Sequence, residues 1–120
     1  MPDPRTRLGL DGERLAAEHL ERLGFTIVAR RHRTRFGELD IVACDGTTLV
    51  FCEVKTRRSP GRCWESLGPS KRRQVRRMAA AYLAGAPDRP RSREIRFDAI
   101  GVVIDPRGRL AALEHLVGAF

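Results

Sequence analysis

The sequence predicts a single α/β domain in which helices flank a mixed β-sheet. A helical segment comes first, three β-rich runs follow it, and a second helix leads into a fourth β-rich run. Short connections join the first three runs and favour antiparallel neighbours, whereas a strand reached through a helix usually lies parallel to its predecessor. The expected order is αβββαβ, with a final segment that is either a short strand or a terminal extension. A length of 120 residues is enough for one core and too short for two.

The first helix is expected to run from Asp11, which can cap it, to about Leu23, where Gly24 can end it. Residues 1–10 are expected to be flexible. The helix has an apolar face that fixes its orientation on the sheet, formed by Leu15, Ala16, His19, Leu20 and Leu23.

The next three β-rich runs cover residues 25–30, 39–44 and 47–55. The basic stretch RRHRTRF is expected to connect the first two runs. The pair Asp45-Gly46 separates the second from the third and is a strong signal for a two-residue hairpin loop.

The second helix is expected from Ser70 to about Gly85, between loops at 57–69 and 86–93. Strands are then expected at 95–104 and 110–116. Asp98 interrupts the first of these, and the sequence allows it either to pair with a buried arginine or to cap a helix. The apolar stripe of the second helix is formed by Val75, Met78, Ala79, Tyr82 and Leu83.

Three charged residues, Asp40, Glu53 and Lys55, stand inside the otherwise apolar second and third runs. With Asp45-Gly46 as the loop, Asp40 faces Phe51, so all three charges share one face of the sheet. Asp40 and Glu53 are then diagonal neighbours, roughly 7–8 Å apart at the backbone. The opposite face collects core residues: Leu39, Ile41, Ala43, Val50, Cys52 and Val54.

Two carboxylates at this spacing can converge on one hard divalent cation. Mg²⁺ prefers carboxylate oxygens and water as ligands, and Mn²⁺ accepts the same donors. Such an ion lowers the pKa of its water and offsets charge on a phosphate, while Lys55 beside it could stabilise the transition state. The alternative is a salt-bridge cluster of Asp40, Glu53 and Lys55 on an exposed sheet face.

The charge distribution favours a polyanionic partner. The net charge is +8, and residues 55–96 hold thirteen Lys or Arg against three acids. A solvated basic face without a partner is the alternative. The chain uses 21 arginines and only two lysines, Lys55 and Lys71. These two positions are therefore candidates for sites where a compact ammonium is needed and a guanidinium is not suitable.

Composition also bears on location. No apolar run approaches the roughly 18 residues that span a bilayer, and the N-terminus has no apolar signal core. Three cysteines without CxxC spacing fit reduced thiols. We therefore expect a cytoplasmic protein that does not contact a membrane.

The block GELDIVACDGTTLVFCEVKTR resembles the G-E-I-D-L-I-A … V-F-V-E-V-K-T-R block of the bacterial YraN family. Further matches are Gly12-Glu13 in the first helix, residues 71–83, Arg96-Phe97-Asp98, and the ending around His115. The resemblance extends from about Gly12 to Phe120, nearly the whole chain.

The YraN family is similar in pattern to the PD-(D/E)xK nuclease superfamily, especially to archaeal Holliday-junction resolvases. This resemblance implies a restriction-endonuclease-like core and assigns Asp40, Glu53 and Lys55 to the motif. It also implies that Glu13 reaches the metal from the first helix, so that Asp40, Glu53 and Glu13 form the metal site. Glu38 shares the face of Asp40 and is a supporting or alternative ligand.

Two functions follow as expectations. The first is a Mg²⁺-dependent phosphodiesterase acting on nucleic acid, DNA more than RNA, including branched or single-stranded structures. A homodimer is expected if both strands of a duplex are cut. The second is a nuclease-like module that binds nucleic acid without cutting it. In both, phosphates are expected to contact Arg31, Arg33, Arg35, Arg57, Arg58, Lys71 and Arg72.

Overall fold

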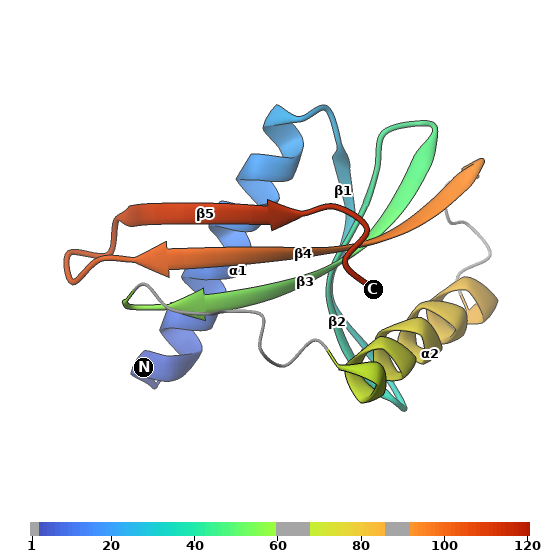
Figure 1. The fold of residues 1–120 in the computed structure, drawn as a ribbon, viewed down its shortest axis with the longest axis horizontal. Coiled ribbons are helices and arrows are strands. Elements are labelled where there is room, and N and C mark those ends of the chain that lie inside the picture. Colours follow the sequence, from blue (N-terminus) through green and yellow to red (C-terminus); the bar gives the residue numbers. More distant parts are fainter. Residues whose placement is uncertain (1–2, 60–67, 86–91) are drawn as a thin grey trace.

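The computed structural model describes residues 3–59, 68–85 and 92–120, without the side chains of residues 4–6. The central parts of the two predicted long loops lie outside these ranges. Within the ranges, neither helix is long and apolar enough to cross a membrane. The elements are α1 (Pro4–Arg22), β1 (Thr26–Thr34), β2 (Gly37–Cys44), β3 (Thr48–Arg57), α2 (Pro69–Gly85), β4 (Glu94–Ile104) and β5 (Leu110–Leu116) (Figure 1).

The five strands form one mixed sheet in the order β1-β2-β3-β4-β5. β1, β2 and β3 are an antiparallel meander, β4 lies parallel to β3, and β5 is antiparallel to β4. The predicted αβββαβ order and the parallel crossover through α2 are therefore confirmed. The final segment is a strand.

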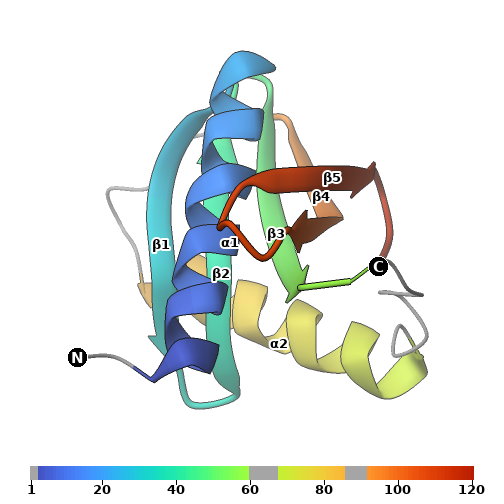
Figure 2. The same ribbon diagram turned by 90° about the vertical axis from the view of Figure 1, so that its left-hand side faces the viewer.

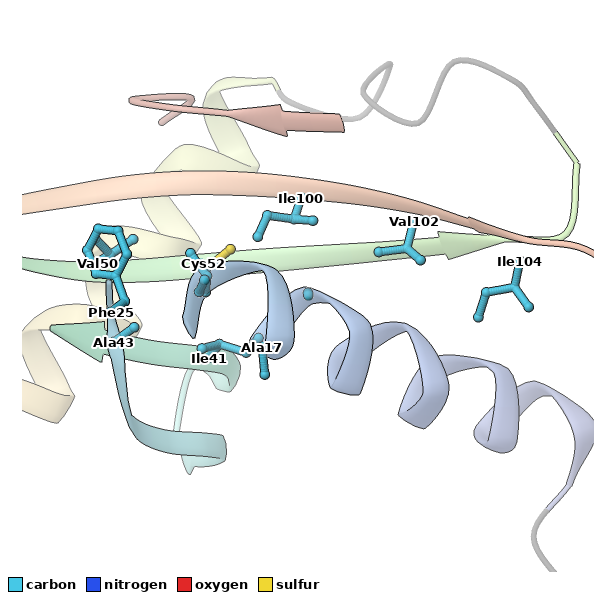
Figure 3. Close-up of a cluster of buried hydrophobic side chains, with 11 residues drawn as sticks. Ala17, Phe25, Ile41, Ala43, Val50, Cys52, Ile100, Val102 and Ile104 are labelled. Atoms are coloured by element: carbon cyan, nitrogen blue, oxygen red, sulfur yellow. The ribbon is translucent and has the colours of Figure 1, made fainter. Parts of the chain in front are cut away.

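The two helices cover opposite faces of the sheet. Figure 2 shows α1 in front of the sheet, where Ala16, Ala17 and Leu20 pack against a core cluster drawn in Figure 3. α2 covers the other face with the predicted stripe, of which Val75, Met78, Ala79 and Tyr82 are buried. Because both faces are covered, the central strands β3 and β4 are apolar on both sides.

α1 begins seven residues earlier than the sequence predicted, so Asp11 lies inside the helix and does not cap it. Pro4 suits the first position of a helix, since its missing N–H would have no partner there. Leu8 packs against the core below α1, which extends the apolar face by about two turns. The expected flexibility of residues 1–10 stays a prediction.

The basic stretch after residue 30 was predicted as a connection, and this was wrong, because β1 continues to Thr34. β1 is an edge strand, where exposed charged side chains are tolerated and discourage pairing with other chains. The turn is confined to the end of the stretch, where the Thr34 hydroxyl donates to the Gly37 carbonyl at 2.7 Å.

The hairpin between β2 and β3 turns one residue later than predicted, at Gly46-Thr47. The Asp45 carboxylate accepts the N–H groups of Thr47 and Thr48 at 2.9 and 2.8 Å, which fixes the later turn. Cys44 consequently pairs with Leu49 instead of Thr47. The register is shifted by two residues, so the assignment of side chains to faces is unchanged. In this register Phe51 pairs with Val42, and Asp40 lies just beyond the last pair, Ile41↔Cys52.

Leu39 is the exception to the predicted faces. It packs in the α2 cluster, whereas Ile41 and Ala43 pack beneath α1 as expected. The β2–β3 ladder ends at the pair Ile41↔Cys52, so Leu39 is already beyond the paired part of β2. Strand alternation predicted from the hairpin does not extend past that point.

Asp98 in β4 is fully buried and pairs with Arg96, as one of the two sequence alternatives predicted. Arg96 donates to both carboxylate oxygens at 2.9 Å, and the Gly118 N–H donates at 3.0 Å. His115 contacts the same carboxylate at 2.7 Å and is itself 3.0 Å from His19 on α1. One carboxylate thus ties β4, β5, α1 and the C-terminal segment together.

Gly12 sets how closely α1 approaches β3. A Cβ atom at this position would collide with the Thr56 hydroxyl and lie 2.8 Å from Thr56 Cβ. We expect Gly12→Ala to lower the free energy of unfolding by about 1–3 kcal/mol through overpacking. Gly9 in the same helix has open space around it, so Gly9→Ala should instead raise stability by about 0.5–1 kcal/mol. Urea denaturation of both variants checks this, and equal effects at the two positions would contradict it.

Candidate functional site

The candidate site lies where β2 and β3 separate. Their ladder ends at Ile41↔Cys52, directly before Asp40 and Glu53, and Figure 1 shows the two strands diverging from there. Asp40 Oδ2 accepts the N–H of Val54 at 2.8 Å, so a side chain takes the hydrogen bond that a strand neighbour would otherwise accept. The fork leaves room for acidic side chains in the middle of the sheet.

Three carboxylates meet at this fork. Glu13 comes from α1, and Glu38 and Asp40 come from β2; one oxygen from each lies within 4.8 Å of the others. The sequence placed Glu13 and Asp40 together only through the family resemblance, and it had Glu38 as a supporting or alternative ligand. In the structure an oxygen of Glu38 lies within the same 4.8 Å of the other two acids, so all three are candidate ligands.

Glu53 is the fourth acid of the site and is 9% exposed. Its Oε1 is 2.8 Å from Nζ of Lys71, which reaches across from the first turn of α2. The sequence assigned Lys71 to phosphate contacts, and this ion pair was not foreseen. The scarcity of lysine in the sequence pointed to this site, because Lys71 pairs with Glu53 and Lys55 follows Glu53 by two residues on β3.

Asp40 carries the clearest electrostatic perturbation. Burial raises its pKa to about 7, the negative charges of Glu53 and Glu13 add to the rise, and the hydrogen bond from Val54 opposes it. Burial likewise raises the pKa of Glu13; Glu38 and Glu53 raise it further, against the lowering effect of Arg31 and Arg30. The carboxylates are crowded enough to hold a proton near neutral pH, and a bound cation would relieve that crowding.

Lys55 follows Glu53 by two residues on β3 and is half-buried. In the part of the chain that the structure describes, its ammonium forms neither a hydrogen bond nor an ion pair. The two lysines therefore differ. Lys71 is paired with Glu53, whereas the ammonium of Lys55 is available to a ligand.

Comparison with known proteins identifies the family. The profile described as "Uncharacterised protein family UPF0102" matches residues 12–102, which include all the acids and both lysines of the site. The chain belongs to the UPF0102 family. This confirms the resemblance to the YraN family drawn from the sequence.

Full-length UPF0102 relatives are close in sequence. A UPF0102 protein of Acidothermus cellulolyticus is 44% identical over 126 residues, covering 97% of this chain and 95% of the relative. A UPF0102 protein of Mycobacterium avium is 46% identical over 118 residues, covering 95% and 90%. A UPF0102 protein of Chlorobaculum tepidum is 44% identical, covering 94% and 91%.

Two of the predicted phosphate-binding arginines of this UPF0102 protein lie beside the carboxylates, and the others lie elsewhere. Arg31 Nε lies 3.7 Å from Glu13, and Arg33 Nη2 lies 3.7 Å from Glu38, both on exposed side chains. Such surface pairs contribute little to stability and can exchange for a phosphate. Arg35 stacks on the ring of Phe36 at 4.8 Å, where the β1–β2 turn meets α2. The other predicted phosphate contacts, Arg57, Arg58 and Arg72, are exposed at the end of β3 and the start of α2.

The donor set of the UPF0102 site suits a hard divalent cation. The groups that could hold an ion are carboxylate oxygens, and no histidine or cysteine belongs to the group of three acids. Oxygen-only donors select Mg²⁺ or Mn²⁺ over Zn²⁺. Glu13, Glu38 and Asp40 are close enough to share one ion, and Glu53 could join them if Lys71 releases it.

Proposed function

We propose that this UPF0102 protein is a Mg²⁺-dependent nuclease that hydrolyses phosphodiester bonds in nucleic acid, DNA more than RNA, including branched or single-stranded structures. The observation that supports this most is the meeting of Glu13, Glu38 and Asp40 at the fork of β2 and β3, with Glu53 beside them. Acids in the middle of a basic surface repel phosphate unless a cation lies between them. A purely nucleic-acid-binding surface has no use for them.

A bound Mg²⁺ or Mn²⁺ would supply a water of lowered pKa and offset charge on the phosphate. The chain's own residues supply the positioning. Glu13, Glu38 and Asp40 hold the ion from two separate elements, so its place is fixed relative to the sheet. Lys55 follows Glu53 by two residues on β3 and forms no ion pair with the residues that the structure describes, so its ammonium can contact a phosphate oxygen whose charge grows in the transition state.

Lys71 has a different role in this proposal. Its ion pair with Glu53 compensates a nearly buried negative charge when no cation is present. Substrate phosphate offers Lys71 an alternative partner, and Glu53 then becomes free for the cation. Exposed Arg31 and Arg33 can leave Glu13 and Glu38 in the same way and contact the flanking phosphates.

The test is a cleavage assay with purified protein and Mg²⁺ or Mn²⁺ on branched, nicked, single-stranded and double-stranded DNA. Wild type is expected to cut at least one substrate, and Glu13→Gln to lower the rate by about 10²–10⁴-fold, the size expected for a missing catalytic group. Glu21→Gln removes an exposed carboxylate of the same helix and should keep full activity.

A protein that binds these substrates and cuts none of them, with either cation, would contradict the nuclease and support the non-cutting module. Cleavage that persists unchanged in Glu13→Gln would place the chemistry elsewhere. If duplex DNA is cut on both strands, we propose that two copies act together. The cytoplasm is the proposed location, since it holds the substrate.

A further inference from the structure

A second site is indicated by a cavity that the carboxylates do not use. It has a volume of about 390 Å³ and lies between the first turns of α1, the end of β3 and the β4–β5 turn. Figure 1 places these three segments at the same end of the molecule. The volume falls within the range of small-ligand sites. Its lining combines apolar Leu8 and Ile104 with charged Arg7, Asp11, Arg58 and Arg107.

The charges of this cavity are unbalanced. Arg7, Arg58 and Arg107 come from three different elements, and Asp11 is the one carboxylate among the lining residues. In the described ranges of the chain, none of the three guanidinium groups takes part in an ion pair. Like charges brought together repel, and an anion between them relieves the repulsion. Guanidinium groups match the oxygens of phosphate in particular, because they form two parallel hydrogen bonds.

The cavity is also connected to the carboxylates by a short stretch of β3. It lies at the carboxyl ends of the parallel strands β3 and β4, where α/β sheets commonly bind ligands. Arg58 follows Glu53 by five residues, or about 16 Å of extended chain. A strand of nucleic acid rises about 3.4 Å per nucleotide, so the cavity and the carboxylates are within about five nucleotides of each other.

We propose that this cavity binds a phosphate group of the nucleic-acid strand whose phosphodiester bond lies at the carboxylates. The proposal rests on the proposed function for the class of ligand. The cavity holds the strand at a set distance from Glu13 and Asp40, and its net positive charge suits a terminal phosphate as well as a backbone phosphate.

The test measures binding in EDTA, where no cleavage occurs, over a series of salt concentrations. The ligands are a short single-stranded DNA oligonucleotide labelled on an internal base, the same strand with a 5′-phosphate or a 3′-phosphate, and inorganic phosphate as competitor. Arg107→Gln is expected to weaken binding about tenfold and to lower the slope of log K against log salt by about one. Arg58→Gln should do the same.

Arg109→Gln is the matched control. Arg109 is exposed, belongs to the same turn and does not line the cavity, while its N–H and that of Arg107 both bond to Asp105. It should bind nearly as wild type does. Weakening by Arg107→Gln on all three strands identifies a backbone phosphate, and weakening on the phosphorylated strands alone identifies a terminal one. Competition by inorganic phosphate that Arg107→Gln abolishes identifies free phosphate as a ligand.

Equal weakening by Arg107→Gln and Arg109→Gln on every ligand would overturn the proposal, because the cavity would then add nothing to general positive charge. This outcome is separate from the nuclease test. A protein that never cuts DNA can still show the Arg107 effect in EDTA, and a protein that cuts DNA can lack it.

Discussion

Asp40→Asn should make the metal-free protein more stable at pH 8 while removing its response to Mg²⁺. Asp40 has a pKa of about 7 in the folded protein, against 3.8 for an ordinary aspartate. Between pH 3.8 and about pH 7 the folded state therefore keeps a proton on Asp40 that the unfolded state has lost. The free energy of unfolding consequently falls as the pH rises through this window. Asparagine keeps the acceptor oxygen for the Val54 N–H and removes the charge. We expect the stability advantage of the variant to be about 2 kcal/mol larger at pH 8 than at pH 5.

The response to Mg²⁺ completes this prediction. A ligand that binds only the folded state raises its stability, by about 2.7 kcal/mol at a hundredfold excess over the dissociation constant. Thermal unfolding of wild type at pH 8 should shift upward by about 5 °C or more with Mg²⁺, and Asp40→Asn should not shift. Glu21→Gln should behave like wild type in both comparisons. A wild-type protein indifferent to Mg²⁺ and Mn²⁺, or an equal shift in Asp40→Asn, would contradict a cation site at the fork.

The sequence predicts part of this site because side chains along a strand alternate between the two faces of the sheet. The predicted hairpin loop was one residue too early, yet the paired residues of β2 and β3 keep their predicted faces, because moving the turn by one residue shifts the pairing by two. A turn signal and strand alternation were therefore sufficient for the paired part of the hairpin. Short connections predicted the meander, the intervening helix predicted the parallel crossover, and helical spacing predicted the buried stripe from Val75 to Tyr82.

The rest of the site depends on contacts between distant elements, which alternation does not encode. The β2–β3 ladder ends at Ile41, where the Asp40 side chain takes the N–H of Val54, and Leu39 beyond this point packs on the side of α2 instead of its expected side. The contact of Lys71 with Glu53 requires the packing of α2 on the sheet. The extra turns of α1 are held by the packing of Leu8 against the core, which the local sequence of this segment does not reveal.

Asp98→Ala is expected to produce the largest loss of stability of any single change proposed for this protein. The Asp98 carboxylate is fully buried and accepts hydrogen bonds from Arg96, His115 and the Gly118 N–H. Alanine would leave a half-buried guanidinium without its partner and release the C-terminal segment from β4. Breaking a buried ion pair from one side typically costs about 3–5 kcal/mol. Urea denaturation measures the loss, and Glu114→Ala on the neighbouring strand, with an exposed carboxylate, should cost little.

The pH dependence of the free energy of unfolding separates the contribution of the negative charge of Asp98 from that of its packing. Burial alone would raise the pKa of Asp98, but the hydrogen bonds from Arg96, Gly118 and His115 outweigh it and lower the pKa below its ordinary value. A carboxyl group with a lowered pKa contributes stability at pH values above its unfolded pKa and loses that contribution as pH falls through the folded value. Asp98→Asn keeps the shape without the charge, so its deficit relative to wild type should shrink as the pH falls below about pH 4. A deficit that stays the same down to pH 3 would show that Asp98 acts through packing alone, and the four elements it joins would then be held together by their apolar contacts.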